Sequence, residues 1–184
     1  KEKMVTVAPV LLIRPAPGYT LVGKSSISPE TIKIAGSRNI VEGIGSVSTI
    51  PDTIQNATTR IFLTLELASI RGQLIEYTPK TVIFEQDIQS ISERIISEIP
   101  VKIKNERANL QAFVSPQTVS LTVVGGTDFI AGLQPEDIEI SIDFNDWNAQ
   151  QQFYELKVRT PKDVIEWMDL SPTQIELVVT KRVG

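Results

Sequence analysis

The sequence predicts a mainly β protein with short helical turns, arranged as two similar tandem modules of mostly antiparallel or mixed strands. Three features predict this fold: an excess of isoleucine over alanine, runs in which apolar and polar side chains alternate, and a repeated pattern of proline-led runs. The 184 residues include 24 Ile and nine Ala. Because the β-branched Ile packs well on a pleated sheet and Ala is the best helix former, this ratio favours strands.

The alternating runs have the two-residue period of strands with one face in a core and the other in water. They cover residues 31–34, 61–67, 138–143 and 175–179. The clearest of them places four apolar side chains on one face, Ile61, Leu63, Leu65 and Leu67. We expect each run to form a strand.

Two segments replace this alternation with helical spacing. Residues 37–44 and residues 127–133 each hold three large apolar side chains at that spacing, and each follows a glycine. Ser37 and Thr127 are the candidate N-caps. We therefore expect one or two helical turns at each place in the β framework.

Residues 86–99 fit two structures by periodicity alone. Ile88, Ile91, Ile95 and Ile99 form a helical stripe, whereas residues 94–97 fit a strand. The repeat described next favours a long, bent strand or two strands.

The repeat consists of Ser-Pro or Thr-Pro dipeptides, each followed within three residues by an alternating Ile or Val run. Residues 28–36 recur as 115–123, and residues 78–84 recur as 171–177. Proline lacks an N–H and restricts the residue before it to an extended conformation, so it suits the beginning of a strand. The pattern predicts a tandem duplication with modules at residues 1–92 and 93–184; the alternative is a single β-sandwich whose strands begin alike.

Composition argues against several classes of function. The net charge is −4 and the cations are scattered singly, whereas binding to a phosphate backbone needs clustered Lys and Arg. The chain has no Cys and no His, so it lacks thiol chemistry and the commonest general base. No apolar run reaches the length of a membrane span. We predict that the protein is not an enzyme, binds no cofactor and does not bind nucleic acid.

The candidate chemical sites are weak. Asp143 and Asp146 could supply oxygen ligands to a cation, but they lack the glycine and the distal Glu of a calcium loop, and a solvated loop explains them equally. Gly125-Gly126 could expose amides to an anion, although we expect a tight turn with positive φ there and a similar turn at Gly43-Ile44-Gly45. No residue is predicted to be catalytic, to bind a cofactor or to bind a metal.

The aromatic residues leave two interpretations open. Trp147, Phe153 and Tyr154 lie close together in the sequence, and Trp167 follows. They could pack in the core and its loops, or they could be exposed at a carbohydrate-binding or protein-binding surface.

The layout of the repeat resembles the YbbR-like domain family, whose units combine a Pro-led strand, a short turn after a glycine, a segment ending in Asp and a second Pro-led strand. The matching residues are 18–19, 28–36, 47–50 and 78–84 in the first module, and 115–125, 140–143 and 171–178 in the second. Pro9-Val10 and Pro100-Val101 look like the family's module start. The second module has residues 108–111 where the first has Gly18-Tyr19, and the first has no Asp at the place of Asp143 unless Asp52 serves.

The resemblance covers residues 5–182 and implies a β-rich regulatory protein on the outer face of a bacterial membrane, behind an N-terminal transmembrane helix. Since the chain begins at Lys1, we expect that anchor upstream of it. In some bacteria such proteins regulate a membrane diadenylate cyclase, which makes cyclic di-AMP. We therefore expect a non-catalytic interaction segment with a protein partner; the alternative is a cell-surface module that binds carbohydrate or protein.

Overall fold

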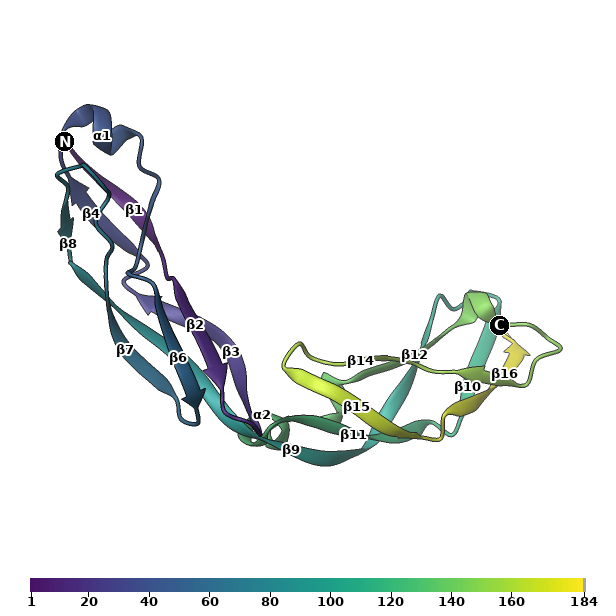
Figure 1. Ribbon diagram of the computed structural model, residues 1–184. Coiled ribbons are helices and arrows are strands. Elements are labelled where there is room, and N and C mark those ends of the chain that lie inside the picture. The colour runs from purple at the N-terminus through teal and green to yellow at the C-terminus, as the bar shows by residue number, and fades with distance from the viewer. Residues whose placement is uncertain (184) are drawn as a thin grey trace. The chain divides into compact units, whose positions relative to one another are not determined.

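The computed structural model describes residues 1–183 and is built mainly of strands, as predicted (Figure 1). The chain divides into two compact units, residues 1–90 and 91–184, which we call module 1 and module 2. Each module has its own core of buried, mainly aliphatic side chains. Among residues 1–183, no helix has both the length and the apolar composition needed to cross a membrane.

Module 1 contains three small groups of paired strands. Its elements are β1 (Glu2–Ala8), β2 (Leu11–Pro15), β3 (Tyr19–Ser28), β4 (Thr31–Ala35), α1 (Arg38–Glu42), β5 (Ser46–Ser48), β6 (Asp52–Ala57), β7 (Ile61–Glu66), β8 (Glu76–Thr78) and the first part of β9 (Thr81–Lys104). The strand orders are β5-β1-β4-β8, β3-β9-β7 and β2-β6. The β1–β5 and β2–β6 pairs are parallel and the others are antiparallel.

Module 2 contains two sheets. Its elements are the second part of β9, β10 (Leu110–Ser115), β11 (Thr118–Gly126), α2 (Thr127–Ala131), the 3-10 helix η1 (Pro135–Asp137), β12 (Glu139–Asp143), the 3-10 helix η2 (Phe144–Asp146), β13 (Phe153–Glu155), β14 (Lys157–Arg159), β15 (Val164–Ser171) and β16 (Gln174–Lys181). The strand orders are β14-β12-β9-β11-β15 and β10-β16-β13. Only the β12–β9 pair is parallel among these pairs.

The two modules share one pairing scheme. The order β5-β1-β4-β8 of module 1 corresponds to β12-β9-β11-β15 of module 2, and β3-β9-β7 corresponds to β10-β16-β13. The parallel pair falls at the same place in each scheme. The predicted internal repeat therefore has a counterpart in strand pairing as well as in sequence.

Hydrogen bonds fix the alignment of the module starts. The Val7 N–H donates to the Glu30 carbonyl at 2.9 Å, and the Val101 N–H donates to the Gln117 carbonyl at 3.0 Å. Glu30 and Gln117 each follow the proline of a Ser-Pro dipeptide. Val7 therefore corresponds to Val101, and the expected equivalence of Pro9-Val10 with Pro100-Val101 is wrong by three residues.

The ambiguous residues 86–99 belong to a single strand of 24 residues, β9. Its first part pairs with β3 and β7 in module 1, and its second part pairs with β11 and β12 in module 2. The side chains of Ile88 and Ile99 are buried in different cores, while Ile91 and Ile95 are exposed. The helical stripe was thus an accident of spacing, and the preference for a long strand is confirmed.

Both predicted helical turns form, as α1 and α2, but their caps differ from expectation. Ser37 is the N-cap of α1 without a capping hydrogen bond from its side chain. In α2 the N-cap is Gly126 rather than Thr127, whose hydroxyl lies 2.6 Å from the Ser92 hydroxyl. At its C-terminal end, each helix has backbone carbonyls that accept hydrogen bonds from a cation on the strand that opens the module, Lys3 for α1 and Arg94 for α2.

The expected positive φ at Gly125-Gly126 is wrong, since neither residue lies in the left-handed region. A close approach explains Gly125 instead. A Cβ on it would lie 2.9 Å from Cγ2 of Ile130 in α2 and 3.3 Å from the Asp163 carbonyl oxygen. Gly43 caps α1 with φ of −79°, so the turn there is right-handed too.

The prolines of the repeated dipeptides lie in two-residue bends between strands, as in the link from β3 to β4. All four peptide bonds before these prolines are cis. Each bend joins strands of different sheets, for example β10 to β11 and β15 to β16. Proline therefore stands where the chain leaves one sheet for another, directly before a strand.

Candidate interaction surface

The carboxylate of Asp143 has a structural partner set. Its Oδ1 accepts a hydrogen bond from the Asn105 side chain at 2.9 Å and one from the Asn145 backbone N–H at 2.9 Å, which makes Asp143 the N-cap of η2. These bonds, the one from Asn105 first, hold the pKa of Asp143 below its usual value. Within residues 1–183 no three acidic, His or Cys side chains gather as a metal site would require. The geometry of Asp143 is that of a cap.

The aromatic side chains separate into packed and exposed ones. Tyr154 is buried, and its hydroxyl bonds the backbone of Asn148 and Gln151 in the loop before β13. Trp147 packs against the module 2 core, and its ring centroid lies 5.6 Å from that of Phe144. Phe153 and Trp167 are 50% and 42% exposed. Of the aromatic residues singled out from the sequence, these two are exposed, while Trp147 is partly buried.

Trp167 lines a groove of about 610 Å³ on module 2. The other polar side chains of its wall come from Glu155, Asp169, Thr173 and Gln174. Trp167 lies on the edge strand β15, where it pairs with Val123 of β11. The groove thus combines one indole with carboxylates, an amide and a hydroxyl.

A second surface lies on the β10-β16-β13 sheet, on the side away from the core. Phe113 lies directly opposite Val178 across β10 and β16, and Phe153 lies opposite Glu176 across β13 and β16. Because side chains alternate along a strand, Phe113, Phe153 and Val178 share one face and are cross-strand or diagonal neighbours. Phe113 is 47% exposed and Val178 is 48% exposed. We call this surface the outer face of module 2; it consists of Phe113, Phe153, Glu155, Glu176 and Val178.

The corresponding face of module 1 carries other side chains. Alignment through the Pro bends and the strand pairs places Ser26, Thr64 and Glu85 where module 2 has Phe113, Phe153 and Val178. This face has its own exposed apolar side chains, Phe62 and Ile83, and the ion pair between Arg60 and Glu85 lies beside them. The two modules therefore present different chemistry on equivalent sheets.

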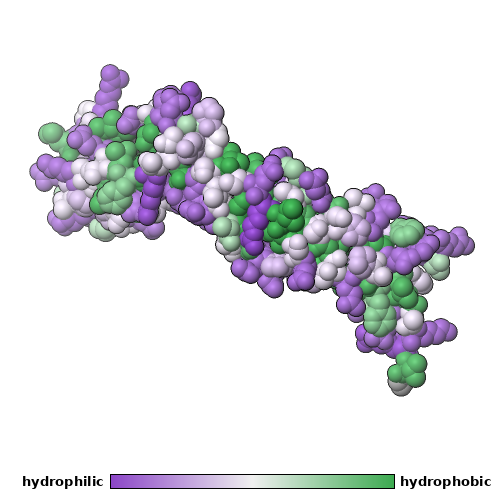
Figure 2. Space-filling model, turned by 90° about the horizontal axis from the view of Figure 1, so that it is seen from below, coloured by the Kyte–Doolittle hydropathy of each residue, from purple (hydrophilic) through white to green (hydrophobic). Residues whose placement is uncertain are grey.

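Apolar side chains are also exposed elsewhere on both modules. On the face drawn in Figure 2 they form separate clusters among hydrophilic side chains. A shallow groove of about 690 Å³ on module 1 is lined by residues 9–12 and 51–53. Exposed Val10, Leu12 and Ile50 lie in or next to these segments. This groove lies where the paired strands β2 and β6 begin.

Sequence reasoning does not single out Phe113 or Val178. The alternation of residues 175–179 places Val178 on the polar side with Glu176, but a single apolar residue on a polar side does not by itself indicate a binding surface. Leu177 proves to face the core and Val178 the solvent. The signal that could have found the outer face is a comparison of the two copies of the repeat, position by position.

Comparison with known proteins supports the family resemblance. The model of the family described as YbbR-like protein matches residues 5–85, which lie within module 1. The chain contains a YbbR-like domain at these residues. The assignment of module 2 to the same family stays a prediction, since the match ends before it.

Two solved structures similar to this YbbR-like protein carry the same family name. One is a YbbR-like protein from Streptococcus pneumoniae, with a TM-score of 0.37 and 13% identity over 99% of this chain and 95% of that one. The other is a YbbR-like domain from Listeria monocytogenes, with a TM-score of 0.38 and 21% identity over 50% of this chain and 97% of that one. No curated protein sequence matches.

Proposed function

We propose that this YbbR-like protein is a non-catalytic interaction segment on the extracytoplasmic side of a bacterial membrane, where it binds and modulates a membrane diadenylate cyclase. The observation that carries the interaction role is the outer face of module 2, three half-exposed apolar side chains on a rigid sheet. The link to the cyclase comes from the family resemblance alone.

Rigid apolar and aromatic side chains on a sheet suit binding because little conformational entropy is lost when they are covered. The strands hold Phe113 and Val178 in register, and both are already half buried by their neighbours. Binding of the partner to this sheet would then link the segment to the membrane protein that it modulates. Turnover of a substrate is not part of this proposal.

The test is crosslinking in cells with the full-length protein in its native membrane. A photoreactive residue replaces Phe153, and the matched control carries it at Phe62 of module 1, which is equally a solvent-exposed phenylalanine on a strand. Recovery of a diadenylate cyclase from the Phe153 position, together with altered cyclic di-AMP in cells that lack the protein, is the expected result. Unchanged cyclic di-AMP and no cyclase at either position would overturn the cyclase role.

The second candidate function is carbohydrate binding, which the Trp167 groove favours. An indole face packs against the C–H groups of a sugar ring, and Glu155, Asp169, Thr173 and Gln174 could bond its hydroxyls. Glycan-array binding that is lost in Trp167→Ala and kept in Phe62→Ala would support it. Binding to no glycan, or equal binding by both variants, would remove it.

A further inference from the structure

We infer that the outer face of module 2 binds an extended segment of a partner protein whose apolar side chains are flanked by Lys or Arg. This inference rests on the proposed interaction role and adds the chemistry of the partner. It follows from the placement of the apolar side chains, from the charges around them and from the open edge beside them.

The apolar part of the face is continuous across three strands. Phe113 and Val178 are a cross-strand pair, and Phe153 is the diagonal neighbour of Val178 on the next strand. Each of the three is about half exposed, at 47%, 48% and 50%. Half of each side chain thus fixes its position, and the other half is available for contact. Aromatic side chains held in this way are the usual centres of binding energy.

The charge on this face has one sign. Glu176 stands on β16 opposite Phe153, and Glu155 lies two residues along β13 on the same side. Among the described outward residues of β10, β16 and β13 there is no Lys or Arg. A partner with basic residues beside its apolar anchors would therefore be complementary, whereas an anionic surface would be repelled.

The charge of the whole module points the same way. Residues 91–184 contain nine Lys and Arg and fourteen Asp and Glu, a net charge of −5, while residues 1–90 contain nine and eight, a net charge of +1. Four of the module 2 cations lie on the other sheet, Lys102 and Lys104 on β9 and Lys157 and Arg159 on β14. Lys157 lines a pocket together with Phe153 and Glu155, so it cancels part of the negative charge at that end of the outer face. The remaining negative charge would steer a basic segment towards the face.

An open strand edge lies next to this face. β16 pairs with β10 over residues 176–181 but with β13 only over residues 174–176. In the described part of the chain, no strand continues the pairing of β16 beyond β13 on that side. An extended segment could add to this edge through backbone hydrogen bonds while its side chains cover Phe153 and Val178.

Module 1 suggests the substitutions for a negative control. It forms the equivalent sheet with Ser26, Thr64 and Glu85 at the positions of the apolar side chains. Phe113→Ser, Phe153→Thr and Val178→Glu therefore install residues that this pairing scheme accepts. The triple variant removes the apolar contact and is expected to retain the sheet.

The first experiment uses a display library of random short peptides as the probe. The library is selected on the immobilised 184-residue chain and counter-selected on the triple variant. The expected result is a set of net-positive peptides with aromatic or aliphatic residues between Lys or Arg. Their Kd should rise at least about tenfold in the triple variant, which is the loss of affinity typical of removing a residue at the centre of an interface. The matched control Phe62→Ser should bind as the parent does.

Salt and charge provide the second readout. Binding should weaken as salt rises from about 0.05 M to about 0.5 M, because the charges on this face are exposed to solvent. Glu155→Gln with Glu176→Gln should weaken binding and flatten that salt dependence. Circular dichroism and thermal unfolding check each variant; if the triple variant is unfolded, Phe113→Ser alone is used in its place.

Three outcomes would overturn the inference. Selected peptides could be acidic or uncharged, no peptide could be enriched, or a dimer that dissociates in the triple variant could appear in analytical ultracentrifugation, which would assign the face to a second copy. The outcome is separable from the proposed function. If a cyclase is crosslinked only from another surface, the proposed function stands and the inference about the outer face fails. If basic peptides bind the outer face but no cyclase is recovered in cells, the inference stands and the cyclase role fails.

Discussion

The two modules pair their strands in the same order but differ in what their sheets present to solvent. Core positions match in kind, as with Ile32 and Val119 in the strands after the Ser-Pro bends, both of which are buried. Outward positions differ, as with Ser26 and Phe113. The pairing scheme is therefore set by inward side chains and turns, and the outward side chains are free to acquire separate roles.

A second difference lies after the parallel strands. Module 1 extends them with the parallel pair β2–β6. Module 2 has η2 there, which inserts Phe144 into the interior with no exposed surface. The Arg107 guanidinium lies 5.3 Å from the centre of the Phe144 ring. One module thus continues its backbone pairing where the other relies on a buried aromatic side chain.

The largest effect is expected from Phe144→Ala. Removal of a fully buried Phe should lower the free energy of unfolding by about 3–4 kcal/mol, because it leaves a cavity as well as losing burial. Chemical denaturation measures the total, and hydrogen exchange should place the loss in module 2. The control Phe62→Ala, at an exposed site of module 1, should change stability little. A loss shared equally by both modules would contradict the independence of the two cores.

The glycines before the two helices give the next effect. A Cβ on Gly125 meets Ile130 Cγ2 at 2.9 Å, while one on Gly36 meets the Leu74 carbonyl oxygen at 3.1 Å and Val41 Cγ2 at 3.3 Å. Gly125→Ala should cost about 2 kcal/mol and Gly36→Ala about 1 kcal/mol, as overpacking does. The matched control is Gly45→Ala, where a Cβ has open space, and it should be neutral or slightly stabilising in thermal unfolding.

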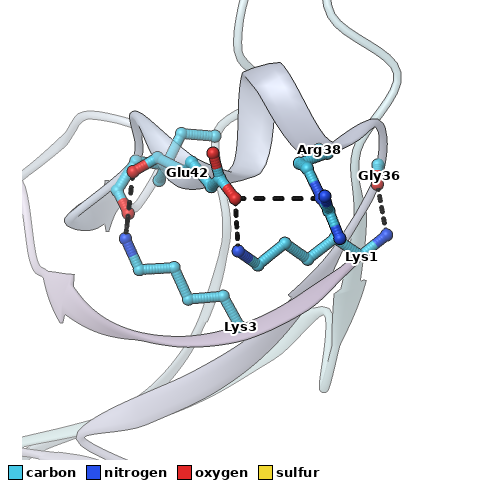
Figure 3. A network of polar contacts seen from close by, with 6 residues as sticks. Lys1, Lys3, Gly36, Arg38 and Glu42 are labelled. Carbon is cyan, nitrogen blue, oxygen red and sulfur yellow. Dashed lines mark hydrogen bonds and ion pairs between the residues drawn. The ribbon is translucent and has the colours of Figure 1, made fainter.

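A cation on the first strand of each module closes its short helix. In module 2 the Arg94 guanidinium donates to the carbonyls of Ile130, Ala131 and Leu133 at 2.7, 3.2 and 2.7 Å. In module 1 the Lys3 ammonium donates to the carbonyls of Glu42 and Ile44 at 3.3 and 2.7 Å, beside the Lys1–Glu42 and Arg38–Glu42 ion pairs (Figure 3).

Loss of these contacts should be larger in module 2. Arg94→Ala removes a planar donor that serves three carbonyls and should lower the free energy of unfolding by about 1.5 kcal/mol, with Lys3→Ala near half of that. Hydrogen exchange at the amides of α1 and α2 reports each helix separately. Equal losses in both modules, or a full rescue by Arg94→Lys, would show that the fork of the guanidinium does not matter.

Much of the fold could be predicted from the sequence because alternation and helical spacing report which side of an element is buried. Residues 31–34 and 61–67 form β4 and β7 nearly to their ends. What alternation does not report is the pairing partner. Residues 153–155 and 157–159, for example, form two separate strands, β13 and β14, which pair with β16 and β12 in different sheets.

The local structure around the helices was less predictable than the strands. Thr127 has the right residue type for an N-cap, yet the N-cap is Gly126, one residue earlier. The Thr127 hydroxyl instead bonds the Ser92 hydroxyl. Gly125 has the right residue type for a turn with positive φ, yet glycine is needed there because Ile130 lies too close for a Cβ. In both cases residue type allows several local structures, and a contact distant in sequence selects among them.

The smallest effect should come from pH at the η2 cap. Hydrogen bonds from Asn105 and from the Asn145 amide, in that order, lower the pKa of Asp143, and the Lys104 side chain lowers the pKa of Glu139. A carboxyl whose pKa is lower in the folded state stabilises the fold at neutral pH. That stabilisation begins to fall as pH drops through the usual carboxyl pKa of about 4 and is lost below the lowered value.

Acidification should therefore loosen η2 before the rest of module 2. Asp143→Asn keeps an acceptor for the Asn145 amide but cannot titrate, so it should flatten the pH dependence of exchange at that amide. Asp143→Ala should raise exchange there at every pH, since it removes the acceptor as well. If the Asn variant kept the parent's pH profile, another group would be responsible for it. The β2–β6 pair of module 1 provides the comparison within the same sample, because backbone pairing holds the equivalent place there.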